Sequence, residues 1–124
     1  MKKVINTDQA PAAIGAYSQG VIGREMIFTS GQLGLDPVTG ELKETIEAQA
    51  HQALQNIRAI IQEAGSSMDH VLKMTIYLKD MNDFATVNEI YAMYFLEPFP
   101  ARSAIQVARL PKDGLIEIEA IALL

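Results

Sequence analysis

The sequence contains no cysteine. Disulfides, thiolate metal ligands and cysteine nucleophiles are therefore excluded, and the absence fits a reducing compartment. Positive charge is also scarce, because 10 lysines and arginines stand against 15 aspartates and glutamates, which leaves a formal net charge of −5. The basic residues are scattered, so no basic stripe is available to neutralise a phosphate backbone. Nucleic acid is not an expected partner.

Long apolar runs are missing as well. No segment approaches the roughly 18 apolar residues that a membrane-spanning helix requires. The N-terminal residues Met1–Asp8 turn polar after two apolar positions, whereas a signal peptide needs an apolar stretch of about 7 to 15 residues. We therefore expect a soluble cytoplasmic protein with no membrane partner.

The fingerprints of cofactor and metal chemistry are absent too. The chain has no glycine-rich dinucleotide loop, Walker loop, HExxH pair or nucleophile elbow, each of which needs its residues at fixed offsets. Its two histidines do not suggest a metal site, because His51 falls on a polar helix face and His70 precedes a strand. We expect no cofactor and no metal.

What the sequence does contain is enough apolar material for one core. Its 124 residues are 49% hydrophobic and 20% charged, which is ordinary globular usage. A length near the mode for domains leaves no room for two independent cores, and no repeat or linker divides the chain. We expect a single domain over residues 1–124.

Apolar residues at spacings of three and four predict two helices. The first runs from about Thr45 to Ala64, and Gly65 follows where a left-handed cap is favoured. The second runs from about Asn82 or Asp83 to Phe95. Each has one apolar face, so each helix must lie on another element.

Five strands are predicted. Ser18–Ile22 and Met26–Ser30 flank a short turn and indicate a hairpin. Val71–Leu78 alternates, with an apolar side that faces the helices, made of Leu72, Met74, Ile76 and Leu78. Arg102–Ala108 and Leu115–Leu123 are joined by a short turn-prone connection, which favours an antiparallel pair.

The resulting order is β-β-α-β-α-β-β. It predicts a two-layer α+β sandwich, in which two helices cover one face of a predominantly antiparallel sheet. In the last two strands we expect an inner set of Ser103, Ile105, Val107, Ile116, Ile118 and Ala120, and an outer set of Arg102, Ala104, Gln106, Glu117, Glu119 and Ile121. The outer set is too apolar to be simply solvated, so a homo-oligomer that packs sheet against sheet is expected.

Two charged groups of this outer set can carry chemistry. Arg102 follows two prolines that fix the approach to its strand, and its planar fork matches a small carboxylate. A salt bridge is the alternative. Glu117 or Glu119 can hold and polarise water as a general base, or can simply neutralise the arginine across the expected hairpin.

Two further motifs can line a pocket. Tyr17 is an aromatic with a polar tip beside glycines, although ordinary core packing explains it as well. Ser30 and Gly31 end a strand, where a glycine lets backbone groups approach a ligand closely. A plain turn explains that pair equally well.

Taken together, the motifs resemble those of a known family. They are Ala10–Gly20 (APAAIGAYSQG), Ser30–Gln32 (SGQ), Asn82–Phe84 (NDF), Val87–Asn88, Pro100–Ser103 (PARS), Val107–Lys112 (VARLPK) and Ile116–Glu119 (IEIE). In their order and spacing over nearly the whole chain they resemble the RidA (YjgF) reactive intermediate deaminase family. The resemblance implies a chorismate-mutase-like fold and a homotrimer with its sites in clefts between neighbouring subunits.

The same resemblance implies an activity and a set of residues. The activity is the cofactor-free hydrolysis of 2-iminobutanoate and 2-iminopropanoate to 2-oxo acids and ammonia. Arg102 matches the arginine that binds the substrate carboxylate, and Glu117 matches the glutamate that orients the water. The cleft lining that the resemblance implies is Tyr17, Ser30, Gly31, Phe84, Asn88 and Ala104. The family often has cysteine at the position of Ala104, so any role of that thiol is absent here.

Two other functions are alternatives to this one. A regulatory trimer that binds small carboxylates in the same cleft, without significant turnover, is the main alternative. The endoribonuclease activity suggested for some relatives conflicts with the acidic charge and the lack of a basic track for RNA.

Overall fold

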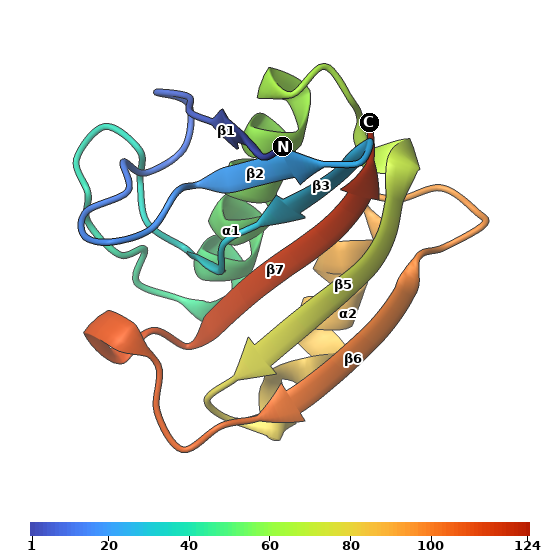
Figure 1. Ribbon diagram of the computed structural model, residues 1–124. Coiled ribbons are helices and arrows are strands. Elements are labelled where there is room, and N and C mark those ends of the chain that lie inside the picture. The colour runs from blue at the N-terminus through green and yellow to red at the C-terminus, as the bar shows by residue number, and fades with distance from the viewer.

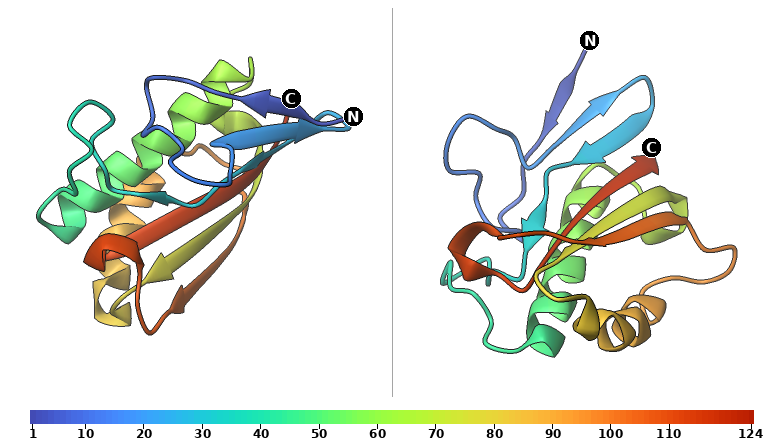
Figure 2. Two further views of the ribbon diagram at one scale, coloured as in Figure 1. Left: turned by 60° about the vertical axis from the view of Figure 1, so that its left-hand side comes forward. Right: turned by 90° about the horizontal axis from the view of Figure 1, so that it is seen from below.

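The computed structural model describes all residues 1–124, arranged as a seven-stranded sheet with two α-helices on one of its faces (Figures 1 and 2). The helices are α1 (Ile46–Glu63) and α2 (Phe84–Ala92). The strands are β1 (Lys3–Ile5), β2 (Gly20–Gly23), β3 (Met26–Thr29), β4 (Gln32–Leu33), β5 (Val71–Leu78), β6 (Ala101–Gln106) and β7 (Ile116–Leu123). The predicted α+β sandwich is confirmed, with the short strands β1 and β4 added to it.

The sheet runs in the order β1-β2-β3-β7-β5-β6, with β4 paired to part of β7. Every neighbouring pair is antiparallel except β5 and β6, which are parallel. The expected pairing of the last two strands is therefore wrong, because β5 lies between them. The connection 107–115 leaves β6 at the sheet edge and crosses the end of β5 to reach β7 (Figure 1). It is a crossing, not a hairpin.

This pairing decides which way the side chains of β6 point. In the parallel register Met74 lies beside Arg102, and Ile76 lies beside Ala104. Met74 and Ile76 are fully buried beneath the helices, so Arg102 and Ala104 lie on the helix side of the sheet. The expected assignment of inner and outer side chains on β6 is therefore wrong. Ile105, which is 49% exposed, belongs to the outer face.

The expected assignment of inner and outer side chains on β7 is confirmed. Ile116, Ile118 and Ala120 are buried, and the intervening Glu117, Glu119 and Ile121 are only partly covered on the outer face. On β5 the expectation is wrong at one position. The register shifts between Val71 and Lys73, so Val71 is buried while Leu72 is 42% exposed. A bulge of this kind inserts an extra residue and reverses the alternation before it.

The first helix forms where its sequence predicts. Thr45 caps the N-terminus by accepting a hydrogen bond from the Ala48 amide at 3.1 Å. At the other end Gly65 takes a φ of 89°, and the amides of Gly65 and Ser66 donate to carbonyls of the last turn. This is the Schellman arrangement that a glycine permits.

Two polar side chains of α1 are buried and fasten the helix to the sheet. Gln49 accepts a hydrogen bond from the Leu115 amide at 2.8 Å, just ahead of β7. Asn56 donates to the carbonyls of Leu33 and Leu35 at 3.2 and 3.0 Å. Because these bonds reach segments far away in the sequence, they fix the register of β4 and β7 against α1.

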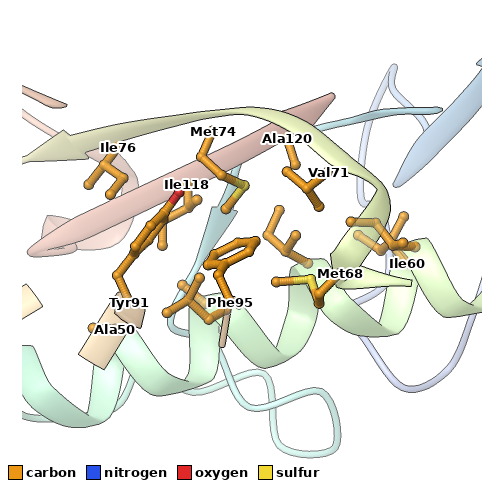
Figure 3. Packing of buried hydrophobic residues seen from close by; sticks show 14 of the residues in the cluster. Ala50, Ile60, Met68, Val71, Met74, Ile76, Tyr91, Phe95, Ile118 and Ala120 are labelled. Atoms are coloured by element: carbon orange, nitrogen blue, oxygen red, sulfur yellow. The ribbon is translucent and has the colours of Figure 1, made fainter. Parts of the chain in front are cut away.

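The second helix is shorter than predicted. The 3-10 turn Met81–Asp83 precedes it, and α2 itself ends at Ala92 instead of Phe95. Tyr91 and Phe95 stack in the core with ring centroids 4.6 Å apart (Figure 3). The Tyr91 hydroxyl points toward the underside of the sheet near Ile118 and has no hydrogen-bond partner. Neither helix is long and apolar enough to span a bilayer.

Candidate functional site

Arg102 extends from the edge strand β6 into a groove beside α2. Its Nη1 donates a hydrogen bond to Oδ1 of Asn88 at 2.6 Å. The guanidinium carbon lies 5.1 Å from the ring centroid of Phe84 and 4.9 Å from that of Tyr91. Phe84, Asn88 and Tyr91 are spaced four and three residues apart, so one face of α2 presents all three. The arginine is held by one amide and two aromatic rings.

No carboxylate of the chain neutralises this arginine. The two ion pairs of the structure join Lys43 to Asp36 and Arg109 to Asp113. A guanidinium offers five N–H donors, and Asn88 occupies one of them. Arg102 also lines a cavity of about 350 Å³, together with Asn88, Tyr91, Ala92, Phe99 and Pro100. The salt-bridge alternative therefore does not apply within one chain, and the geometry suits a small anion.

Glu117 extends from β7 into a second cavity, of about 560 Å³, on the outer face of the sheet. Burial, and after it the charge of Glu119, raises the pKa of Glu117. Its side chain packs directly on Gly31, where an added Cβ would lie 2.9 Å from the Glu117 carboxyl carbon. A glycine at this position is therefore what gives the carboxylate its place in the cavity.

The wall of the second cavity comes from the loop ahead of β2 and from the end of β3. Tyr17 is 52% exposed, and its hydroxyl accepts a hydrogen bond from the Ile14 amide at 3.4 Å. Ser30 donates its hydroxyl to the Ser18 carbonyl at 2.6 Å. The cavity is also lined by Pro11, Ala12, Ile14, Gln32, Leu33, Leu35, Pro111 and Lys112. Lys112 is its only cation.

Several contributors to these cavities were not predicted. Gln19 is buried, accepts a hydrogen bond from the Thr7 amide at 2.7 Å, and donates to the Pro11 carbonyl at 2.8 Å, so it fixes the loop that carries Tyr17. Lys112 has a left-handed φ of 56°, which is uncommon outside glycine. The turn-prone residues Pro111–Gly114 were the available signal for that strained loop, whereas no local pattern marks a buried glutamine.

The expected site residues fall into two groups. Tyr17, Ser30, Gly31 and Glu117 line the outer cavity, whereas Asn88 and Arg102 line the groove beside α2 with the Phe84 ring against the guanidinium. Ala104 packs against the core two residues beyond Arg102 and lines neither cavity. The expectation that Arg102 and Glu117 share the outer sheet face is wrong within one protomer.

A third hollow lies away from both groups. It has a volume of about 590 Å³ and runs along the polar side of α1 next to residues 36–38. It is lined mostly by glutamines and charged side chains that are open to solvent, and it contains none of the expected residues. Size alone therefore does not mark the site. The two smaller cavities contain the unpaired arginine and the partly buried glutamate.

Known proteins are similar to this chain in sequence and fold along nearly their whole length. Residues 7–124 match the family model described as Endoribonuclease L-PSP. The chain is 54% identical over 125 residues to the 2-iminobutanoate/2-iminopropanoate deaminase of Salmonella typhimurium, with 98% of each chain covered. It superposes with a TM-score of 0.95 on the crystal structure of Escherichia coli TdcF with bound serine, at 50% identity and 98% coverage of both chains.

A second solved structure gives the same result. The YjgF gene product of E. coli superposes with a TM-score of 0.94 at 53% identity, again over 98% of both chains. Identity at this level over the whole chain leaves no doubt about common ancestry. The chain belongs to the endoribonuclease L-PSP family, whose members include the RidA, YjgF and TdcF proteins.

Proposed function

We propose that this protein, acting as one domain over residues 1–124, is a 2-iminobutanoate/2-iminopropanoate deaminase that hydrolyses reactive imino acids to 2-oxo acids and ammonia. The observation that carries the proposal is a fixed arginine with no carboxylate partner in its own chain. The 54% identity with a relative named for this activity supports it. The lack of cysteine fits the cytoplasm as the place of the reaction.

Arg102 is the group that binds the substrate carboxylate. Asn88 and the two rings fix the plane of the guanidinium before any substrate arrives. A bidentate contact of this charge-assisted kind contributes on the order of 1.5 to 3 kcal/mol. That contribution corresponds to roughly ten- to a hundredfold in affinity, which is decisive for a ligand of only a few atoms.

Glu117 is the group that activates water. Because its pKa is raised by burial and by Glu119, the carboxylate is a better proton acceptor than an exposed glutamate. The water oxygen bonds to the imine carbon while Glu117 takes one of its protons. Return of that proton to nitrogen gives a carbinolamine, C(OH)–NH2. Transfer of its hydroxyl proton to the nitrogen then forms the C=O bond as the C–N bond breaks, and the 2-oxo acid and ammonia leave. The imine also hydrolyses on its own, so orientation is the main demand on the enzyme.

The two groups belong to different protomers of a homotrimer. Arg102 and Glu117 lie on opposite faces of one sheet, so a substrate that contacts both must lie between two subunits. The outer face carries the apolar side chains that such packing would cover, among them Phe28 at 41% and Ile105 at 49% exposed. The Arg102 groove opens at the sheet edge, where the Glu117 cavity of a neighbour can meet it.

A regulatory trimer without turnover is the second candidate. The TdcF structure with bound serine supports carboxylate binding in a relative and does not require catalysis. The two functions differ in one observable, because a binding protein takes up 2-oxobutanoate without accelerating the loss of an imine.

The experiment is an imine hydrolysis assay coupled to threonine dehydratase, with R102A as the test variant and R58A as its matched control. Arg58 also stacks on a tyrosine ring, at 5.4 Å from that of Tyr94, but it lies outside both cavities. We expect the wild type and R58A to accelerate 2-oxo acid release and R102A to lose the acceleration. Full acceleration by R102A would disprove the role of Arg102. Binding without acceleration by the wild type would favour the regulatory trimer.

A further inference from the structure

The outer face of β7 presents two glutamates, and only one of them has a hydrogen-bond partner. Tyr77 on β5 donates its hydroxyl to Oε1 of Glu119 at 3.0 Å. In the strand register Tyr77 stands beside Glu117, yet its hydroxyl reaches diagonally to Glu119. Such a diagonal lies within reach of a long aromatic side chain. Glu117 makes no side-chain hydrogen bond and borders the cavity, which Glu119 does not.

We propose that Tyr77 is a positioning residue for the hydrolysis, which holds Glu119 turned aside by its hydrogen bond so that Glu117 alone receives the proton of the attacking water. The inference deepens the deaminase function and rests on it. It assigns a task to a side chain that touches neither the expected substrate nor either cavity. Tyr77 acts through the pair of carboxylates beside it.

The physical basis is the sharing of one proton between two neighbouring acids. Residues two apart on a strand lie about 7 Å apart on one face, close enough for their charges to interact. A hydrogen bond donated to a carboxylate favours its ionised form, so an incoming proton goes to the partner without a donor. Glu117 is that partner.

The directions of the pKa shifts agree with this division. The hydrogen bond to Glu119 is the main cause that raises the pKa of Tyr77, so the phenol keeps its proton and remains a donor. Burial and the Glu119 charge raise the pKa of Glu117. A Glu119 carboxylate held in place by Tyr77 thus keeps the water-activating Glu117 basic.

Other charged or titratable groups around the pair do not replace Tyr77. Lys112 and Tyr17 border the Glu117 cavity, and Lys73 on β5 stands beside Ile121, two residue pairs beyond the pair of Thr75 and Glu119. None of the three is hydrogen bonded or ion paired to either glutamate. The helices lie on the opposite face of the sheet (Figure 2).

The test is a carboxyl ¹³C NMR titration of Glu117 in the intact protein, with the variants Y77F and E119Q. Y77F removes the hydrogen-bond donor of Glu119, so Glu119 competes with Glu117 for the proton. E119Q removes the negative charge of residue 119, which otherwise disfavours a second charge on Glu117. We therefore expect both variants to move the Glu117 midpoint to lower pH. The matched control is Y94F, because Tyr94 also makes a hydroxyl hydrogen bond, to His51 at 2.9 Å, away from this face. An unchanged or higher midpoint in Y77F would overturn the inference.

Kinetics provide the second readout. We expect the acid limb of the pH profile of kcat to move to lower pH in Y77F, with kcat reduced and KM unchanged, because the carboxylate grip is untouched. A wild type that does not accelerate imine loss would remove the deaminase function, but the titration would still report the coupling of Tyr77 to Glu117. A wild type that accelerates, together with a Y77F profile identical to its own, would overturn the role of Tyr77 alone.

Discussion

Arg102 and Glu117 lie on opposite faces of one sheet. Arg102 leaves β6 on the helix side, beside the buried Met74, and is bonded to Asn88 on α2. Glu117 leaves β7 on the other side, against Gly31. Because the sheet separates them, one protomer cannot apply both groups to one small substrate. Under the proposed function, each subunit therefore contributes Arg102 to one site and Glu117 to another.

The first prediction concerns Asn88. The variant N88A removes the acceptor that orients Arg102, and we expect a moderate rise in KM. N88D keeps the shape but places a carboxylate 2.6 Å from the guanidinium, where it neutralises the charge that the substrate must bind. We expect N88D to raise KM by about tenfold or more, since a charge-assisted contact is lost.

The control for this prediction is N82D, which adds the same charge on the 3-10 turn ahead of α2, outside both cavities. Initial rates over a range of imine concentrations separate KM from kcat. If N88D binds substrate as well as the wild type, Arg102 does not hold the carboxylate.

The second prediction concerns Gly31. An alanine there brings its Cβ within 2.9 Å of the Glu117 carboxyl carbon and must displace the carboxylate. Misplacing a catalytic group by about 1 Å can cost a hundredfold, so we expect G31A to reduce kcat by roughly 10- to 100-fold. G23A is the matched control, because an added Cβ at Gly23 meets nothing within 4 Å. If G31A turned over substrate as fast as G23A, the position of the Glu117 carboxylate against Gly31 would not matter for catalysis.

The third prediction concerns the stability cost of Glu117. Its pKa is raised in the folded state, so the stability linked to its protonation is present at low pH and is lost as pH rises through the folded value. At neutral pH the folded protein therefore holds an unfavourable charge, and E117Q should melt at a higher temperature than the wild type. The difference should close as the pH falls toward the ordinary glutamate value of 4.5.

Thermal melts at several pH values check this prediction. E41Q is the control, because Glu41 is exposed on a loop outside both cavities and its change should leave the melting temperature nearly constant. A melting temperature for E117Q that is lower than that of the wild type at neutral pH would show that the charge stabilises the fold.

Much of the fold follows from local pattern. The bounds of α1 were predicted within a residue or two, because its spacing, its Thr45 cap and Gly65 all agree. The alternation of β7 was equally clear, since the inner positions Ile116, Ile118 and Ala120 are apolar and the first two outer positions, Glu117 and Glu119, are charged. Such elements need no knowledge of their neighbours.

The failures concern pairing and site assembly. Strand β6 reads Ala-Arg-Ser-Ala-Ile-Gln, which has no strong alternation, so its inner face depends on its neighbour. That neighbour is β5, reached through the α2 crossover, whereas the short connection to β7 favoured a hairpin. Because β6 pairs with β5 and not with β7, Arg102 lies on the helix side of the sheet and not on the outer face. The motifs pointed to both Arg102 and Glu117, but no local pattern places the two residues on opposite faces of the sheet.

The most direct test of the account is to mix two inactive variants, R102A and E117Q. In a trimer with sites between neighbours, each mixed trimer contains one site with both groups intact. Random association of equal amounts should then restore about a quarter of the wild-type activity. Subunit exchange is verified by native mass spectrometry of tagged chains. A trimer that exchanges subunits and remains inactive would contradict a site shared between protomers.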